Sequence, residues 1–159
     1  MDKKPVQATS LTMAHQTLPQ DANPAGNVHG GVIMRHIDTA GGVVAIRHAR
    51  GNAVTASVDR LDFLAPVFVG DLIIVKASLN HVGRTSMEVG VRVEAENLFT
   101  GDVRHCASAY ITYVALDKDG RPKNIPELIL ETEEEKRRNT EAQARRTMRQ
   151  AERMREKTI

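Results

Sequence analysis

The stretch Gly30–Arg47 restricts the fold most strongly, because its apolar residues recur at three- and four-residue intervals over nearly the whole surface of a helix. A helix that is apolar on most sides has to be buried against other elements. Within it, Gly41 and Gly42 each cost about 1 kcal/mol relative to alanine, so another backbone should pack closely against that face. The sequence therefore predicts a central helix in tight contact with a sheet or with a partner helix.

The rest of the apolar pattern predicts β-strands joined by short turns. The five expected strands are residues 11–18, 54–63, 72–79, 86–95 and 105–116. In the strand 54–63, the parity of the apolar positions changes near Asp59-Arg60, which predicts a β-bulge. The order of strand, helix and four closely spaced strands predicts an α+β fold in which an antiparallel five-stranded sheet wraps around the helix.

The composition changes beyond Pro126. Residues 127–159 contain 9 Lys and Arg and 8 Asp and Glu, with no glycine or proline. The acidic residues come first and the basic residues last, which suits the dipole of a helix. We expect residues 1–126 to form one domain, followed by a charged and solvated C-terminal helix over 127–159. Contact between the basic end of this helix and a polyanion is the less favoured alternative.

Composition sets the class of protein. The chain has 159 residues, of which 41% are hydrophobic and 26% charged, as in an ordinary soluble domain. Only 3% are aromatic and the net charge is +2, which disfavours binding to nucleic acid. The single cysteine, Cys106, excludes an internal disulfide. With neither a signal peptide nor a membrane span indicated, we expect a cytoplasmic protein that does not bind membranes.

The segment that carries the chemistry is the start of the central helix, with Asn27, His29, Gly30 and Gly31, followed along the helix by Asp38. Main-chain amides in a first helical turn have no internal partners and carry the positive end of the dipole, so they can bind a developing oxyanion. Asp38 is an isolated carboxylate in an apolar stretch. Partial burial raises the pKa of such a group and suits it to act as a general base toward water.

The spacing of these groups has a geometric consequence. Asp38 lies about 12 Å along the helix axis from the helix start, too far to share a water molecule easily with Gly31 of its own chain. If two such helices pack antiparallel across a twofold axis, the start of one can face the middle of the other. The sequence therefore predicts a composite site at a homodimer interface.

Five stretches of sequence stand out: Gly-Asn-Val-His-Gly-Gly at 26–31, Ile37-Asp38, Asp-Phe-Leu-Ala-Pro-Val at 62–67, Val-Gly-Asp at 69–71, and residues 109–117. Together they resemble the motifs of hotdog-fold acyl-CoA thioesterases of the cytosolic long-chain acyl-CoA hydrolase type. The resemblance covers roughly residues 8–126. It implies a hotdog fold, hydrolysis of fatty acyl-CoA to CoA and a carboxylic acid, and a dimer assembled further into a hexamer, as a trimer of dimers. Asn27 and Asp38 match the family's two functional positions, supplied by different protomers.

On this basis Asp38 would deprotonate or orient a water molecule that attacks the thioester carbonyl. Direct attack by the carboxylate, which would form an anhydride, is the other possibility. Asn27 would hold the water or the carbonyl, and the Gly31 amide would complete the oxyanion hole beside Gly30. His29 would orient the loop through a hydrogen bond. We expect no metal and no cofactor, because CoA is part of the substrate and the product.

The phosphates of CoA require cationic and hydrogen-bonding groups near the mouth of the site. The candidates are Arg60, at the expected bulge, and Arg84, Thr85 and Ser86, in the turn between two strands. Two other functions stay open at this point. They are a hotdog enoyl-CoA hydratase or dehydratase, and a non-catalytic acyl-CoA-binding sensor.

Overall fold

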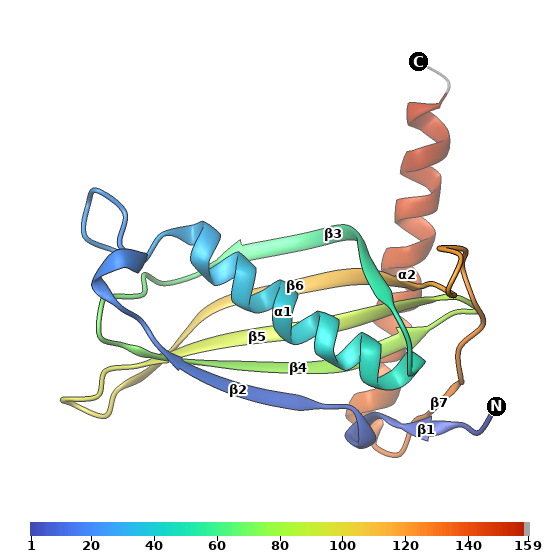
Figure 1. Ribbon diagram of the computed structural model, residues 1–159, viewed down its shortest axis with the longest axis horizontal. Helices are drawn as coiled ribbons and strands as arrows, with labels where there is room; N and C mark the ends of the chain where they lie inside the picture. The colour runs from blue at the N-terminus through green and yellow to red at the C-terminus, as the bar shows by residue number, and fades with distance from the viewer. Residues whose placement is uncertain (158–159) are drawn as a thin grey trace.

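The computed structural model describes residues 1–157 and has three layers (Figure 1). A sheet forms the middle layer, with α1 (Gly30–Ala49) on one face and α2 (Glu133–Glu156) on the other. The strands of this sheet are β2 (Leu11–Gln16), β3 (Ala53–Phe63), β4 (Leu72–Val82), β5 (Ser86–Glu96) and β6 (Val103–Ala115). They are antiparallel in the order β2-β4-β5-β6-β3. The predicted five-stranded antiparallel sheet around a central helix is confirmed.

β3 forms one edge of the sheet and pairs only with β6. Its register shifts twice, between Thr55 and Ser57 and between Val58 and Arg60. The second shift is the bulge that the sequence predicts. Because a bulge bends a strand and re-aims its side chains, Asp59 faces the layer of α2, where it bonds Arg149, while Thr55 faces α1, where it bonds Asp38.

The hydrophobic core lies between α1 and the sheet. The helix buries Ile33, Ile37, Ala40 and Val44 there, together with Gly41. A Cβ atom added to Gly41 would lie 2.4 Å from the hydroxyl of Tyr113 on β6, so only glycine fits at this position. The close contact predicted for the glycine pair is confirmed at Gly41, but the neighbour is a side chain of the sheet rather than a backbone.

The ends of the chain form a small structure that the sequence did not indicate. β1 (Lys4–Pro5) pairs in parallel with β7 (Leu128–Ile129), and the 3-10 turns η1 (Val6–Ala8) and η2 (Pro19–Asp21) flank β2. α2 therefore begins at Glu133 rather than at residue 127. Thr132 caps it, with its side chain accepting from the Glu135 amide, while the Glu135 carboxylate accepts from the Thr132 amide. Within residues 1–157, no helix is both long and apolar enough to cross a bilayer.

The expectation that α2 is a solvated helix is wrong for its central part. Arg145 donates two hydrogen bonds of 2.8 Å to Glu88 of β5 and lies 3.7 Å over the ring of Tyr110. One turn later Arg149 bonds Asp59 of β3. Burial raises the pKa of Asp59, and the charge of Arg149 opposes that shift. Two arginines thus hold α2 on the outer face of the sheet.

Replacing Arg145 with alanine leaves Glu88 charged in a site where its side chain is only 5% exposed. We expect Arg145→Ala to lower the free energy of unfolding by about 3 kcal/mol, measured by urea denaturation at fixed protein concentration. Adding Glu88→Gln removes the unpaired charge and should recover part of this loss. Arg153→Ala, on the exposed end of the same helix, is the control and should change the value by less than about 0.5 kcal/mol. Equal losses in the two single variants would contradict the anchoring role.

His48 lies at the end of α1 and is fully buried. Its Nε2 lies 2.6 Å from the Pro126 carbonyl oxygen, so Nε2 carries the proton, while the buried Nδ1 has no partner within residues 1–157. Burial lowers the pKa of His48, although its bond to Pro126 opposes the shift. The folded chain therefore requires the neutral ring.

Because the folded-state pKa of His48 is lowered, the unfolded chain takes up this proton first as the pH falls. The stabilisation is complete above the unfolded pKa of about 6.5 and declines below it. We expect thermal unfolding midpoints measured from pH 8 to pH 5 to fall less steeply in His48→Gln, whose amide can still donate to Pro126. His105→Gln, on β6, whose Nε2 bonds Ser108, is the control and should retain the wild-type slope. If the thermal midpoint falls with pH in the same way in the wild type and both variants, His48 is not the group that causes the loss of stability at low pH.

Candidate functional site

The loop before α1 is ordered by its own hydrogen bonds. The Asn23 amide donates to the Asn27 carbonyl at 2.7 Å, and the Asn23 side chain accepts from the Ala25 amide at 3.0 Å. Gly26 has φ +95°, a conformation that side chains other than glycine rarely adopt. The turn is fixed to α1 because the His29 amide donates to the Asp21 carbonyl. These contacts place Asn23 and Asn27 next to each other, ahead of the helix start.

The first turn of α1 differs from the sequence prediction in one respect. His29 is the N-cap, and its Nδ1 accepts from the Gly31 amide at 2.8 Å. The Gly31 amide is therefore not a free oxyanion donor in the single chain, because the capping ring occupies it. The Gly30 amide has no acceptor within the described residues. His29 thus makes the expected structural hydrogen bond by capping the helix, and the Gly30 amide is the donor left for a ligand.

Asp38 lies in the middle of α1, and its carboxylate accepts hydrogen bonds from hydroxyl groups on two strands. The Thr55 hydroxyl donates to Asp38 Oδ1 at 2.7 Å, and the Tyr113 hydroxyl lies 3.1 Å from the same oxygen and 3.0 Å from the Asp38 carbonyl. No group among residues 1–157 donates to Oδ2. The Asp38 side chain is exposed in the single chain. One protomer alone therefore does not provide the partial burial that the sequence predicts for this carboxylate.

Exposed apolar side chains occur on both elements that meet at Asp38, among exposed polar ones such as Arg35 and Thr39. Exposed side chains on the two elements that flank it are Met34 and Ile46 of α1 and Val54, Val58 and Phe63 of β3. β3 also has an edge with unpaired main-chain groups, which proteins rarely leave uncovered. Exposed apolar side chains beside an uncovered strand edge favour an interaction site. The carboxylate thus lies inside a face that a second molecule can cover.

The candidate CoA-binding residues lie at two separate places on the sheet, since Arg60 is opposite Tyr110 and Ser86 is opposite Val114. Arg60, on β3, is exposed and pairs with Asp62 at 2.6 Å. Residues 84–86 lie in the turn from β4 to β5, where the Thr85 carbonyl accepts from the amide of Ala115, at the end of the sheet where α1 ends. A single chain therefore does not bring the predicted site residues together. Any site that uses all of them needs two chains.

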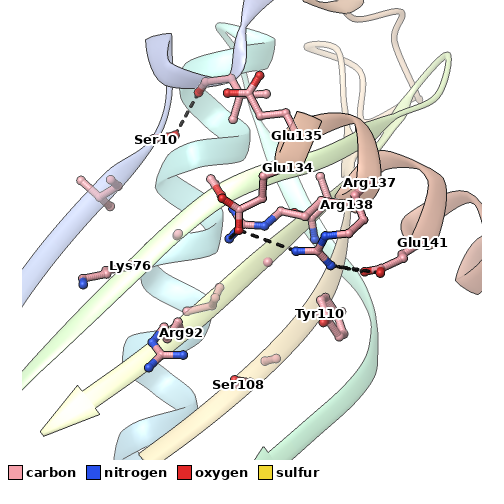
Figure 2. Close-up of a pocket in the computed structure, with 18 of the residues that line it drawn as sticks. Ser10, Lys76, Arg92, Ser108, Tyr110, Glu134, Glu135, Arg137, Arg138 and Glu141 are labelled. Atoms are coloured by element: carbon pink, nitrogen blue, oxygen red, sulfur yellow. Dashed lines mark hydrogen bonds and ion pairs between the residues drawn. The ribbon is translucent and has the colours of Figure 1, made fainter. Parts of the chain in front are cut away.

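Asp38 lines neither of two cavities formed among residues 1–157. A cavity of about 400 Å³ adjoins the start of α1 and is lined by His29, Gly31 and Arg35 among others. A groove of about 710 Å³ lies on the outer face of the sheet beside α2. In Figure 2, Lys76, Arg92 and Tyr110 enter this groove from strands, and the remaining charged groups come from α2.

The groove beside α2 is a poor anion site because its cations already have carboxylate partners. The pairs are Lys76–Glu94, Arg137–Glu141, Arg138–Glu134 and Arg145–Glu88. It also lies on the opposite face of the sheet from α1. Within residues 1–157, no group of three or more His, Cys, Asp or Glu side chains is arranged to hold a metal ion.

Sequence reasoning missed Thr55 and Tyr113 as members of the site. Both were interpreted only as strand residues, because the pattern of a strand does not tell which helix position each side chain meets. The one available signal is the glycine at position 41, which implies a close neighbour without naming it. The contact of Tyr113 with Gly41 and with Asp38 became visible only in the folded chain.

Comparison with known proteins identifies the family. The model of the thioesterase superfamily matches residues 25–98. An uncharacterized acyl-CoA thioester hydrolase from Bacillus subtilis is 38% identical over 127 residues, which cover 80% of this chain and 74% of that protein. The human cytosolic acyl coenzyme A thioester hydrolase is 37% identical over 142 residues, covering 88% of this chain. The chain spans only 37% of the length of that human relative.

Solved structures agree over nearly the whole chain. An apo-hexameric acyl-CoA thioesterase superposes with a TM-score of 0.92 at 38% identity, covering 96% of this chain and 97% of that one. An acyl-CoA hydrolase from Staphylococcus aureus, in complex with butyryl coenzyme A, coenzyme A and coenzyme A disulfide, gives 0.90 at 34% identity, covering 98% of this chain and 95% of that one.

Three further structures are variants of the S. aureus enzyme, in which an asparagine, an aspartate or a threonine is replaced by alanine. A hexameric hotdog-fold thioesterase of Campylobacter jejuni is more distant, with a TM-score of 0.68 at 36% identity over 79% of this chain and 92% of that one. With the fold and the relatives in agreement, the chain belongs to the hotdog-fold acyl-CoA thioester hydrolases.

Proposed function

We propose that this enzyme hydrolyses fatty acyl-CoA to free CoA and a carboxylic acid, with Asp38 of one protomer as general base and the helix start of a second protomer as oxyanion site. The observation that carries the proposal is the state of the Asp38 carboxylate. Two hydroxyls bond Oδ1, whereas Oδ2 accepts no hydrogen bond from residues 1–157. The carboxylate lies on a face with exposed apolar side chains, which a second chain could cover. The binding of butyryl-CoA by the S. aureus neighbour supports an acyl-CoA substrate.

The second protomer is inferred from distance and from exposed surface. About 12 Å of helix separates Asp38 from the helix start of its own chain, so the two cannot act on one carbonyl. Pairing of β3 with a second β3 about a twofold axis would cover the sheet edge and the exposed apolar side chains of β3 and α1. The same operation would bring the partner's helix start toward Asp38. Because two solved neighbours are hexameric, we infer a trimer of such dimers.

The asparagine of the site is proposed to be Asn23 rather than the expected Asn27. In the S. aureus enzyme, the three positions replaced by alanine are fifteen residues apart from asparagine to aspartate and seventeen from aspartate to threonine. Asn23, Asp38 and Thr55 have the same two spacings in this chain. Asn27 is closer to Asp38 in sequence, and its carbonyl instead closes the loop on the Asn23 amide. We assign Asn27 to the loop and Asn23 to the substrate.

The reaction follows from these positions. Oδ2 of Asp38 takes a proton from water as the water oxygen bonds to the thioester carbon, and the oxyanion that forms accepts from the Gly30 amide. The tetrahedral intermediate then breaks its carbon–sulfur bond and releases the acid and the CoA thiolate, and the proton held on Oδ2 passes to that thiolate, which restores the Asp38 carboxylate. A thiolate needs less proton assistance than an amine, so one carboxylate suffices. One oxyanion donor contributes about 3 kcal/mol and a general base about 10²- to 10⁴-fold in rate.

Arg60, Arg84, Thr85 and Ser86 remain the proposed contacts for the phosphates of CoA, reached from the partner's side of the interface. No metal or cofactor is invoked in this mechanism. The similarity to cytosolic hydrolases supports a cytoplasmic location. The hydratase and sensor alternatives have no specific observation in their favour.

We expect Asp38→Asn to lower kcat at least 100-fold, because the amide cannot accept a proton from water while it keeps the shape of the carboxylate. The measurement is release of free CoA from a panel of acyl-CoA esters of increasing chain length, followed with a thiol-reactive dye. Asp102→Asn, an exposed change in the loop between β5 and β6, is the control and should remain active. Full turnover by Asp38→Asn would falsify the proposed base, and loss of enoyl absorbance without thiol release would favour the hydratase.

Mixing two inactive variants tests the shared site. If Asp38→Asn and Asn23→Ala exchange subunits freely, half of the dimers contain one of each, with one of their two sites intact, so about a quarter of wild-type activity should return. Asn27→Ala, the matched control in the same loop, should be active on its own. Mixed dimers that stay inactive would place both groups of each site in one chain. Sedimentation of the active protein as a monomer would exclude the interface.

A further inference from the structure

We propose that Tyr113 is a positioning residue that fixes the Asp38 carboxylate in the orientation required for proton transfer, so that Oδ2 is always the oxygen presented to the attacking water. This inference rests on the proposed role of Asp38 and adds the element that aims it. Tyr113 does not touch the substrate in this proposal. It acts through Asp38 alone.

The phenol of Tyr113 reaches Asp38 from the core. Its side chain is 1% exposed and crosses the space between β6 and α1. The hydroxyl lies 3.0 Å from the Asp38 main-chain carbonyl and 3.1 Å from Oδ1, so one group contacts both the backbone and the carboxylate of the same residue. Burial, followed by the negative charge of Asp38, raises the pKa of Tyr113 well above its usual range. The hydroxyl thus stays protonated and available as a donor.

Gly41 holds the phenol in place. It lies one helical turn after Asp38, and its missing Cβ leaves the space that the hydroxyl occupies, with Tyr113 Cζ and Cε2 at 3.0 Å from the position of a Cβ. At an ordinary buried helix position alanine would be favoured over glycine by about 1 kcal/mol. The close approach of Tyr113 is what requires glycine here. The space at Gly41 therefore fixes the position of the Tyr113 hydroxyl, and this hydroxyl fixes the orientation of the Asp38 carboxylate.

Thr55 alone is a weaker constraint. It lies on the edge strand at an exposed position, and its hydroxyl rotates about a single bond. Tyr113 is a rigid ring packed in the core, and it approaches the same oxygen from a different strand. Two donors on Oδ1 from two directions restrict rotation of the carboxylate. A displacement of about 1 Å in a reacting group can cost about 100-fold in rate, so this restriction affects catalysis directly.

The test is Tyr113→Phe, which removes one oxygen and keeps the ring. We expect kcat for CoA release to fall at least tenfold, KM to change less than twofold, and the thermal midpoint and oligomeric state to remain close to wild type. The matched control is Tyr110→Phe, which removes the same atom from the outer face of the same strand and should leave kcat unchanged. A purely structural role would lower the thermal midpoint without lowering kcat per folded subunit, and that result would overturn the proposal.

A second variant gives an independent measurement. Gly41→Ala should crowd the hydroxyl and lower kcat, whereas adding it to Tyr113→Phe should lower kcat by a smaller factor than in the wild-type background. If the two changes lower kcat by factors that simply multiply, they act independently. That result would contradict the proposal that Gly41 acts on Asp38 through Tyr113. The proposed function is checked separately with Asp38→Asn. If that variant is inactive while Tyr113→Phe has wild-type kcat, only the positioning role fails; if Asp38→Asn is itself active, the assignment of the base fails.

Discussion

The close contact between α1 and Tyr113 of β6 is the constraint on which the rest of the structure depends. A side chain other than glycine at position 41 would force the helix away from the sheet or displace the phenol. Because protein cores are close-packed, such a change is transmitted rather than absorbed. The same contact that closes the core also brings a hydroxyl to Asp38. Fold stability and the geometry of the candidate base therefore depend on one pair of residues.

A single chain leaves this site unfinished. Asp38 is exposed between apolar side chains of α1 and of the edge strand β3, and the helix start with its open Gly30 amide lies more than two turns away. Exposed apolar surface and an unpaired strand edge both favour association, and the chemistry requires two separated groups to meet. Dimer formation would satisfy the two requirements together. In the proposed mechanism, association of two chains is what allows the base and the oxyanion site to lie on the same helix.

The outer face of the sheet has a different role. Arg145 and Arg149 hold α2 against β5 and β3 through buried or half-buried carboxylates. The cations that line the neighbouring groove are likewise paired with acids of α2 or of the sheet. The face therefore contributes to stability and not to an evident ligand site. Figure 1 shows that α2 and α1 lie on opposite sides of the sheet, which separates this layer from the chemistry.

The sequence by itself determined the five strands of the main sheet, the two helices and their order, because helical and strand periodicities are local properties that burial imposes on each segment. It also determined that the glycines of α1 need a close neighbour, that β3 contains a bulge near Asp59, and that Asp38 is the isolated acid of the helix. It did not determine the start of α2, since the pairing of β7 with β1 involves residues more than 120 positions apart.

The tertiary structure decided which side chains meet. Only the register between β3, β6 and α1 places Thr55 and Tyr113 on the same oxygen of Asp38. The conformation of the loop decided that His29 caps the helix and occupies the Gly31 amide. These contacts join residues far apart in sequence, or depend on one torsion among several local options. No periodicity encodes them, because a pattern records which face is buried and not what lies against it.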